Sequence, residues 1–239
     1  DIVGGIEDIK NGVVRAVGDT SERFIEDRLR IMRIFRFASR MDGVIDFDTF
    51  IAIKSDNRLR GISEKDDVSQ ERIWDEICKA FKQSKDFNVF LKLLTDFDMW
   101  EQIFPGVNIN TELINSKDFL IVITNLFKNE VSSRELETKL IQEFKIEADT
   151  AKKVIFLLSM LSMKVEDVPD MFKKKQQCSI SDSVIAEWLK INSVTDFRTK
   201  FIDFKPSVSS KELMDKGIMG RELGLEIKRL EIENFKRML

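Results

Sequence analysis

The spacing of apolar residues predicts helices along almost the entire chain. After residue 18, apolar positions recur every three or four residues, which is the helical period, and Ser or Asp precedes many of these segments as a candidate N-cap. The pattern predicts helices near residues 21–40, 46–54, 69–82, 86–94, 116–128, 132–145, 147–163, 167–177, 181–190, 194–203 and 220–239, with a short helix after Ser209-Ser210. These ranges predict an all-α fold.

The first eighteen residues have a different pattern. Glycines interrupt short apolar stretches at Gly4-Gly5, Gly12 and Gly18, and the apolar run at 13–17 predicts a short strand. The cluster Asp19-Thr20-Ser21 then provides the N-cap of the first long helix.

Composition narrows the classes of function. With 239 residues, of which 43% are hydrophobic, the chain can bury a core as one large domain or two or three small ones. It has no uncharged apolar run near ~18 residues, so no membrane span is predicted. The absence of His excludes Ser-His and Cys-His catalysis and His-ligated metals. Cys78 and Cys178 form no zinc pattern and favour a reducing cytoplasm. The net charge of −3 does not itself indicate nucleic-acid binding, so any such binding would need a local basic surface.

The segment 21–40 is unusual because its apolar residues cover nearly every side of the predicted helix, which predicts packing all round. Arginines nevertheless recur along it, among them those at positions 23, 30, 33, 36 and 40. Asp27, Arg30 and Arg33 are spaced i, i+3, i+6, which places them along one helical face. An ordinary explanation is an intrahelical Asp27–Arg30 ion pair, which contributes ~0.2–0.5 kcal/mol.

The order of several motifs resembles the bacterial-type (class II) tRNA nucleotidyltransferase and poly(A) polymerase family. That family has a GG-x-x-D segment, an E-D-x-x-R nucleotide-binding motif and an R-x-x-R-F-A stretch. The matching residues here are Gly4-Gly5 with Asp8, Glu26-Asp27 with Arg30, Arg33 with Arg36-Phe37-Ala38, and a tail-like segment at 213–224. Residues 85–205 contribute only helical character.

The resemblance implies a head, neck, body and tail. We assign residues 1–18 to the end of an α/β head and its hinge (Gly4, Gly5 and Asp8), 19–84 to a nucleotide-selecting neck, 85–165 to the body and 166–239 to a tRNA-binding tail. Because the chain starts at Asp1 and has no Gly-Ser turn, we expect the head, with its Mg²⁺-binding carboxylates, to lie outside it. The triplets 46–48 and 96–98 read Asp-Phe-Asp, but they follow no Gly-Ser turn and are predicted to be caps or turns.

The resemblance implies that Asp27 and Arg30 select the incoming base. Cytosine and adenine both present an amino donor beside a ring-nitrogen acceptor, whereas uracil and guanine present a carbonyl beside an N–H. Carboxylates only accept and guanidinium groups only donate, so Asp27 and Arg30 match CTP and ATP. Glu26, Arg33 and Arg36 are supporting or phosphate-binding candidates, although an ion pair or an exposed arginine explains Arg33 and Arg36 equally well.

Basic residues suggest contacts to tRNA phosphates. Lys173, Lys174 and Lys175 form the main cluster, with weaker ones at Lys152-Lys153 and at Arg58 with Arg60, although a solvated helix face is an equally good explanation. The leading hypothesis is CCA addition to tRNA by a head-bearing enzyme, this chain alone being inactive. The alternatives are a poly(A) polymerase, an A-only or C-only adding enzyme, and a non-catalytic helical RNA-binding module.

Overall fold

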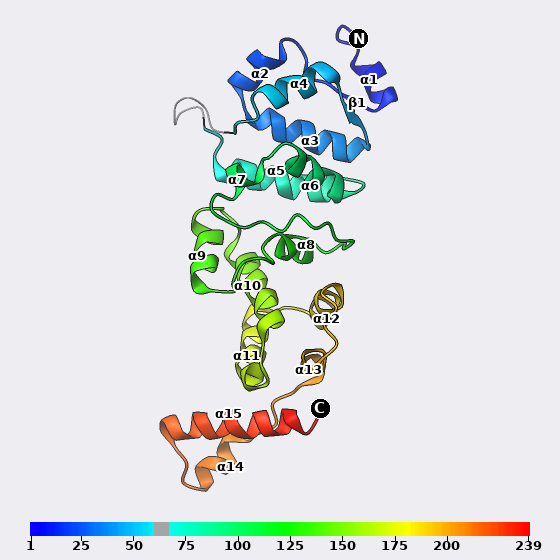
Figure 1. The fold of residues 1–239 in the computed structure, drawn as a ribbon. Coiled ribbons are helices and arrows are strands. Elements are labelled where there is room, and N and C mark those ends of the chain that lie inside the picture. The colour runs from blue at the N-terminus through cyan, green and yellow to red at the C-terminus, as the bar shows by residue number, and fades with distance from the viewer. Residues whose placement is uncertain (60–66) are drawn as a thin grey trace.

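The chain forms an elongated stack of helices, with its first and last elements at opposite ends (Figure 1). The structure is a computed structural model that describes residues 1–59 and 67–239. Its elements are α1 (Gly5–Asn11), β1 (Val13–Val14), α2 (Thr20–Glu26), α3 (Leu29–Met41), β2 (Val44–Ile45), α4 (Phe47–Ser55), α5 (Gln70–Gln83), α6 (Phe87–Asp96), α7 (Trp100–Ile103), α8 (Phe119–Leu126), α9 (Arg134–Gln142), α10 (Ala148–Ser162), η2 (Val165–Asp167), α11 (Val168–Cys178), α12 (Asp182–Ile191), α13 (Phe197–Lys200), η3 (Phe201–Asp203), α14 (Ser210–Asp215) and α15 (Gly220–Lys236). The predicted all-α class is confirmed.

Most predicted helices are present because their N-caps act as expected. The side chains of Asp46, Ser69, Asp86 and Ser209 each accept a hydrogen bond from a backbone N–H in the first turn of their helices. The helix predicted at 194–203 is wrong in part, because this segment forms only the four-residue α13 and the 3₁₀ turn η3.

The N-terminal segment is held by two very short parallel strands. β1 pairs with β2 in the register Val13↔Val44, so the strand predicted over 13–17 shortens to two residues. The strands approach so closely at Gly43 that a Cβ there would lie 2.3 Å from the carbonyl oxygen of Gly12. Gly4 has a φ of +73°, whereas Gly5 is the first residue of α1, a helix that the pattern did not predict.

The predicted helix 21–40 is interrupted at Asp27 and Arg28, and this is a correction. Asp27 has extended backbone angles (φ −154°, ψ 99°), so α2 ends before it and α3 begins at Leu29. The Asp27 Oδ1 atom accepts a hydrogen bond from the Leu29 N–H at 3.2 Å, which stabilises the break in the way that an N-cap does. Asp27, Arg30 and Arg33 therefore do not lie on one continuous helix.

Helix α3 is buried on most sides, but not all round as predicted, because Arg30, Arg33, Phe37 and Arg40 form a partly exposed strip. It packs against α5 and α6, and Ile31, Met32 and Phe35 have no exposed surface. The ring centroid of Phe35 lies 5.0 Å from that of Phe97, just beyond the end of α6. Helix α3 is thus the central support for the break at Asp27.

Candidate functional site

The candidate site is built around the break between α2 and α3. Both carboxylate oxygens of Asp27 accept hydrogen bonds from the Arg72 Nη2 on α5, at 3.1 and 3.0 Å. The Arg33 Nη1 lies 3.6 Å from Asp27 Oδ2. The side chain of Asp27 remains 22% exposed, so a ligand can reach it. The predicted Asp27–Arg30 ion pair is not formed: the break gives Asp27 other partners.

Arg30 is held by the preceding helix. Its Nη1 donates to Glu26 Oε2 at 2.7 Å and to the carbonyl oxygen of Arg23 at 2.9 Å. The Arg23 Nη1 also donates to both oxygens of Glu26. Hydrogen bonds from Arg30 and then Arg23 lower the pKa of the Glu26 carboxyl, which favours its ionised form. Glu26 thus holds Arg30 in place, and its role in nucleotide binding stays a prediction.

Two residues of α5, Arg72 and Glu76, were missed by the sequence analysis. Glu76 is 2% exposed and accepts a hydrogen bond from Arg36 Nε at 2.7 Å. The Arg33 Nε lies 3.9 Å from the same carboxylate. Arg33 therefore lies between Asp27 and Glu76, and Arg36 belongs to a buried ion pair instead of pointing freely to a phosphate. The only feature of the sequence that could have indicated them is that both charged residues lie in a segment predicted to be a packed helix.

A pocket of about 340 Å³ opens beside these residues. Its walls are apolar at Phe24, Ile34 and Phe37. Four arginines also line it, at positions 15, 23, 30 and 33, and no carboxylate does. Asp27 is not part of the lining and reaches the pocket only through its contact with Arg33. An apolar wall beside several guanidinium groups suits a base together with an anionic group.

The described residues do not fit a Mg²⁺ site. No group of three or more Asp, Glu or Cys side chains in residues 1–59 and 67–239 could hold a metal ion. Asp46 caps α4 through the Thr49 N–H and lies 3.2 Å from Arg15 Nη1. Asp96 ends α6, and Asp98 occupies a turn with φ +54°. Both Asp-Phe-Asp triplets thus act as the predicted caps and turns.

The predicted hinge residue Asp8 is tied to the rest of the N-terminal segment. Its carboxylate accepts two hydrogen bonds from Arg15, at 2.9 and 3.0 Å, and Arg15 also pairs with Asp46. These contacts raise the pKa of Arg15, chiefly through the hydrogen bond to Asp8. Asp8 therefore joins α1 to the start of α4.

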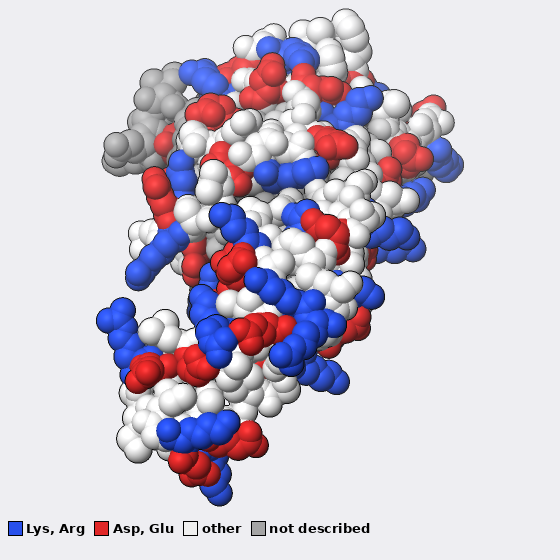
Figure 2. All heavy atoms as spheres, turned by 60° about the horizontal axis from the view of Figure 1, so that its bottom comes forward, with Lys and Arg blue, Asp and Glu red and all other residues white. Residues whose placement is uncertain are grey.

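The predicted phosphate-binding lysines are not equivalent. Lys175 pairs with Asp182, the first residue of α12, and its side chain is only 14% exposed. Lys173 and Lys174 are exposed, and Lys174 lines a pocket of about 440 Å³ with Lys152. Arg60 lies outside the described residues. Figure 2 shows basic side chains gathered across the middle of one face, interleaved with acidic ones.

Comparison with known proteins supports the resemblance found in the sequence. Residues 45–110 match the family model described as the probable RNA and SrmB-binding site of polymerase A. A CCA-adding enzyme of Pediococcus pentosaceus is 28% identical to this chain over 97% of its length. A CCA-adding enzyme of Ligilactobacillus salivarius is 51% identical over 59 residues, a quarter of this chain and 15% of that protein.

The family-model match and these relatives agree with the motifs in pointing to the tRNA nucleotidyltransferase and poly(A) polymerase family. The chain spans 62% of the length of the Pediococcus relative. The fold of the family is also present: a CCA-adding enzyme in complex with CTP superposes with a TM-score of 0.64 at 18% identity, covering 98% of this chain and 62% of that one. The Thermotoga maritima CCA-adding enzyme complexed with tRNA gives 0.61 at 17% identity, with coverage of 98% and 63%. No described helix has both the length and the apolar character needed to cross a membrane.

Proposed function

We propose that this chain supplies nucleobase selection and tRNA binding for the template-independent addition of C and A to tRNA 3′ ends. Its relatives are named CCA-adding enzymes. The solved structures that share its fold include complexes with CTP, ATP and tRNA. The cytoplasmic location expected from the two unpaired cysteines is part of the same proposal.

The observation that carries the proposal is the separate anchoring of Asp27 and Arg30. A carboxylate has about four lone-pair sites, and a guanidinium has five N–H donors. Arg72 and the Leu29 N–H hold Asp27 but leave it capacity to accept an amino hydrogen. Glu26 and the Arg23 carbonyl occupy only one nitrogen of Arg30. Both side chains are therefore held in defined positions and can still form further hydrogen bonds.

The unused acceptor of Asp27 and the unused donors of Arg30 match the bases C and A. Asp27 accepts from the exocyclic amino group, and Arg30 donates to the ring nitrogen. Uracil and guanine would place a carbonyl against the carboxylate and an N–H against the guanidinium. Each unpaired buried polar group costs ~1–3 kcal/mol, so selection needs no nucleic-acid template. Arg33, which contacts Asp27 and lines the pocket, supports the carboxylate or meets a phosphate.

The Mg²⁺-dependent chemistry is assigned to a head outside this chain. Residues 1–18 would form the hinge to that head, 19–84 the neck, 85–165 the body and 166–239 the tail. Exposed apolar side chains near the N-terminus support a packing surface for it; they include Ile2, Ile6, Ile9 and Phe47, which are 104%, 58%, 69% and 74% exposed. We expect the chain alone to add no nucleotides.

Other members of the family would use the same pair. Asp27 and Arg30 serve a poly(A) polymerase, an A-only enzyme or a C-only enzyme equally well. A non-catalytic RNA-binding module is the second class of function. The anchored carboxylate and guanidinium beside an arginine-lined pocket favour nucleotide selection over that module.

Nucleotide addition to a trimmed tRNA tests the proposal. The chain would be assayed alone and joined to the N-terminal part of the Pediococcus pentosaceus relative, with labelled CTP or ATP and Mg²⁺. We expect C and A addition only by the joined protein. Addition by the chain alone would contradict the assignment of catalysis to a head. A joined protein that binds tRNA but adds neither nucleotide would favour the non-catalytic module.

A further inference from the structure

A second pocket, of about 530 Å³, lies where α5 meets α6 and the segment 114–117. Its polar lining consists mainly of lysine, amide and hydroxyl side chains, namely Ser84, Lys85, Asn88, Asn115, Ser116 and Lys117. This pocket is separate from the arginine-lined pocket beside Arg30, with which it shares no residue. Nothing in the proposed base selection uses it.

Lys85 and Lys117 are exposed, and neither forms a hydrogen bond or ion pair within the described residues. The nearby carboxylates already have protein donors. Asp86 accepts from the Asn88 N–H at 2.9 Å, and Glu187 accepts from the Ser116 hydroxyl at 2.7 Å. The two ammonium groups therefore keep their charge available for an external anion.

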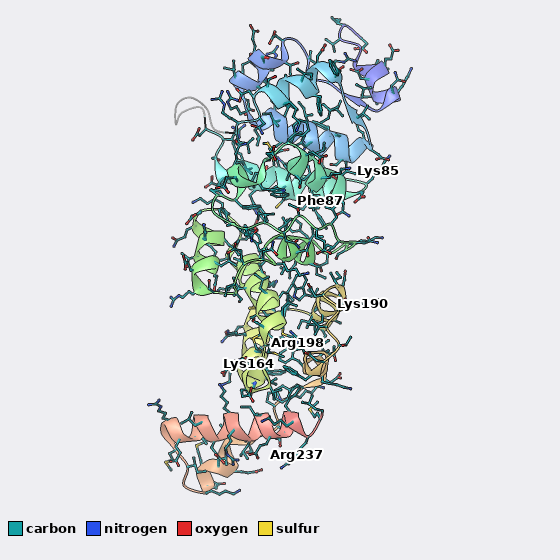
Figure 3. All side chains as sticks on the ribbon, viewed as in Figure 1. Lys85, Phe87, Lys164, Lys190, Arg198 and Arg237 are labelled. Carbon is teal, nitrogen blue, oxygen red and sulfur yellow. The ribbon has the colours of Figure 1, made fainter. Side chains whose placement is uncertain are left out.

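A third lysine extends this basic surface onto α12. The hydrogen bond between Ser116 and Glu187 brings α12 to the edge of the pocket. Lys190 follows Glu187 by three residues, which places it on the same helical face. It is exposed and has no pairing partner in the described residues. In the view of Figure 3, Lys85 and Lys190 lie along the same edge of the molecule.

We propose that Lys85, Lys117 and Lys190, the junction lysines, bind phosphates of an RNA backbone. The proposal rests on the proposed function and assigns part of its tRNA contact to a surface outside 166–239. Lysines bind phosphate as point charges, and amide and hydroxyl groups such as Asn115 and Ser116 suit ribose hydroxyls.

The arrangement favours RNA over a single small anion. The three lysines come from three separate segments of the chain, which suits repeated phosphates better than one compact ligand. The family model for a probable RNA-binding site covers residues 45–110 and therefore includes Lys85. Binding through these lysines would hold the RNA across the junction of the proposed neck and body.

Salt-dependent tRNA binding tests the proposal on this chain. The double variant Lys85→Gln with Lys117→Gln would be compared with Lys10→Gln combined with Lys92→Gln. The control lysines are also exposed and unpaired in the described residues, and they lie outside the pocket. The slope of log K against log salt is negative, and each phosphate contact that a variant loses reduces its magnitude by ~0.7–0.9.

We expect the magnitude of the slope to fall by about 1.4 to 1.8 in the junction variant, with weaker binding at low salt, and to stay unchanged in the control. Adding Lys190→Gln should lower it by about 0.7–0.9 more. If the unmodified chain binds tRNA and the junction variant matches the control, the junction proposal is wrong while the proposed function stands. If the unmodified chain binds no tRNA, the proposed function fails as well. ATP binding that needs both lysines, together with tRNA binding that the junction substitutions leave unchanged, would assign the pocket to a free nucleotide and overturn the RNA proposal.

Discussion

Glu76→Gln, which removes the charge of this side chain but keeps its shape, should strongly destabilise the fold. The carboxylate is 2% exposed and lies 2.7 Å from Arg36, whose side chain is only 10% exposed. Glu76→Gln would leave that guanidinium buried without a counter-charge, and breaking a buried pair costs about 3–5 kcal/mol. For a chain of this size, 1 kcal/mol corresponds to about 2–4 °C. We therefore expect Tm to fall by about 6 to 20 °C, measured by circular dichroism.

The neighbouring Asp75 provides a matched control. Its side chain is 58% exposed and pairs with Lys79, which also contacts Glu76. Asp75→Asn removes the same charge from the same helix but should cost no more than about 0.5 kcal/mol, since exposed i,i+4 pairs contribute little. Equal shifts in the two variants would refute the reasoning that burial makes the Glu76–Arg36 pair indispensable.

Three other predictions follow from single contacts. Arg72→Ala should loosen Asp27 and relax nucleotide selection in the head-bearing protein, with Tm lowered by no more than about 4 °C, because a half-exposed pair contributes ~0.2–1 kcal/mol; unchanged selection would count against the anchoring role. Burial raises the pKa of the Cys78 thiol to about 11, so iodoacetamide at pH 8 should modify this thiol far more slowly in the folded chain than in urea. Because the unfolded chain loses this proton at lower pH than the folded chain does, the free energy of unfolding should fall as pH rises from about 8.5 towards 11. Gly43→Ala should cost about 1–3 kcal/mol by forcing a Cβ onto the carbonyl of Gly12, and an unchanged melt would show that the strands can separate freely.

Local signals predicted most of the helices. The caps at Asp46, Ser69 and Asp86 depend on the first turn of their own helix, and the spacing of apolar residues depends on only a few neighbours. The packing of α3 on most of its sides was also predictable, because apolar residues cover most of its surface, although Arg30, Arg33, Phe37 and Arg40 leave one strip partly exposed. Such features need no knowledge of distant parts of the chain.

The geometry at Asp27 could not be predicted in the same way. Its main partner, Arg72, lies 45 residues away on another helix, so a spacing argument selected the nearer Arg30 instead. Lys175 shows a related limit, since its pairing with Asp182 depends on the course of the short connection between α11 and α12. The sequence motif located the candidate residues, but tertiary contacts decide which of them pair with one another.

Nucleotide selection by Asp27 and Arg30 variants tests the central claim most directly. Incorporation of all four nucleotides would be measured for Asp27→Ala and Arg30→Ala in the head-bearing protein, beside a thermal melt. We predict that discrimination against U and G falls by ~1–3 kcal/mol in each variant, or about 5- to 150-fold, and that Arg30→Ala also uses C and A less well. Unaltered discrimination in both variants, with only a modest loss of stability, would contradict the account and leave Asp27 and Arg30 with purely structural contacts.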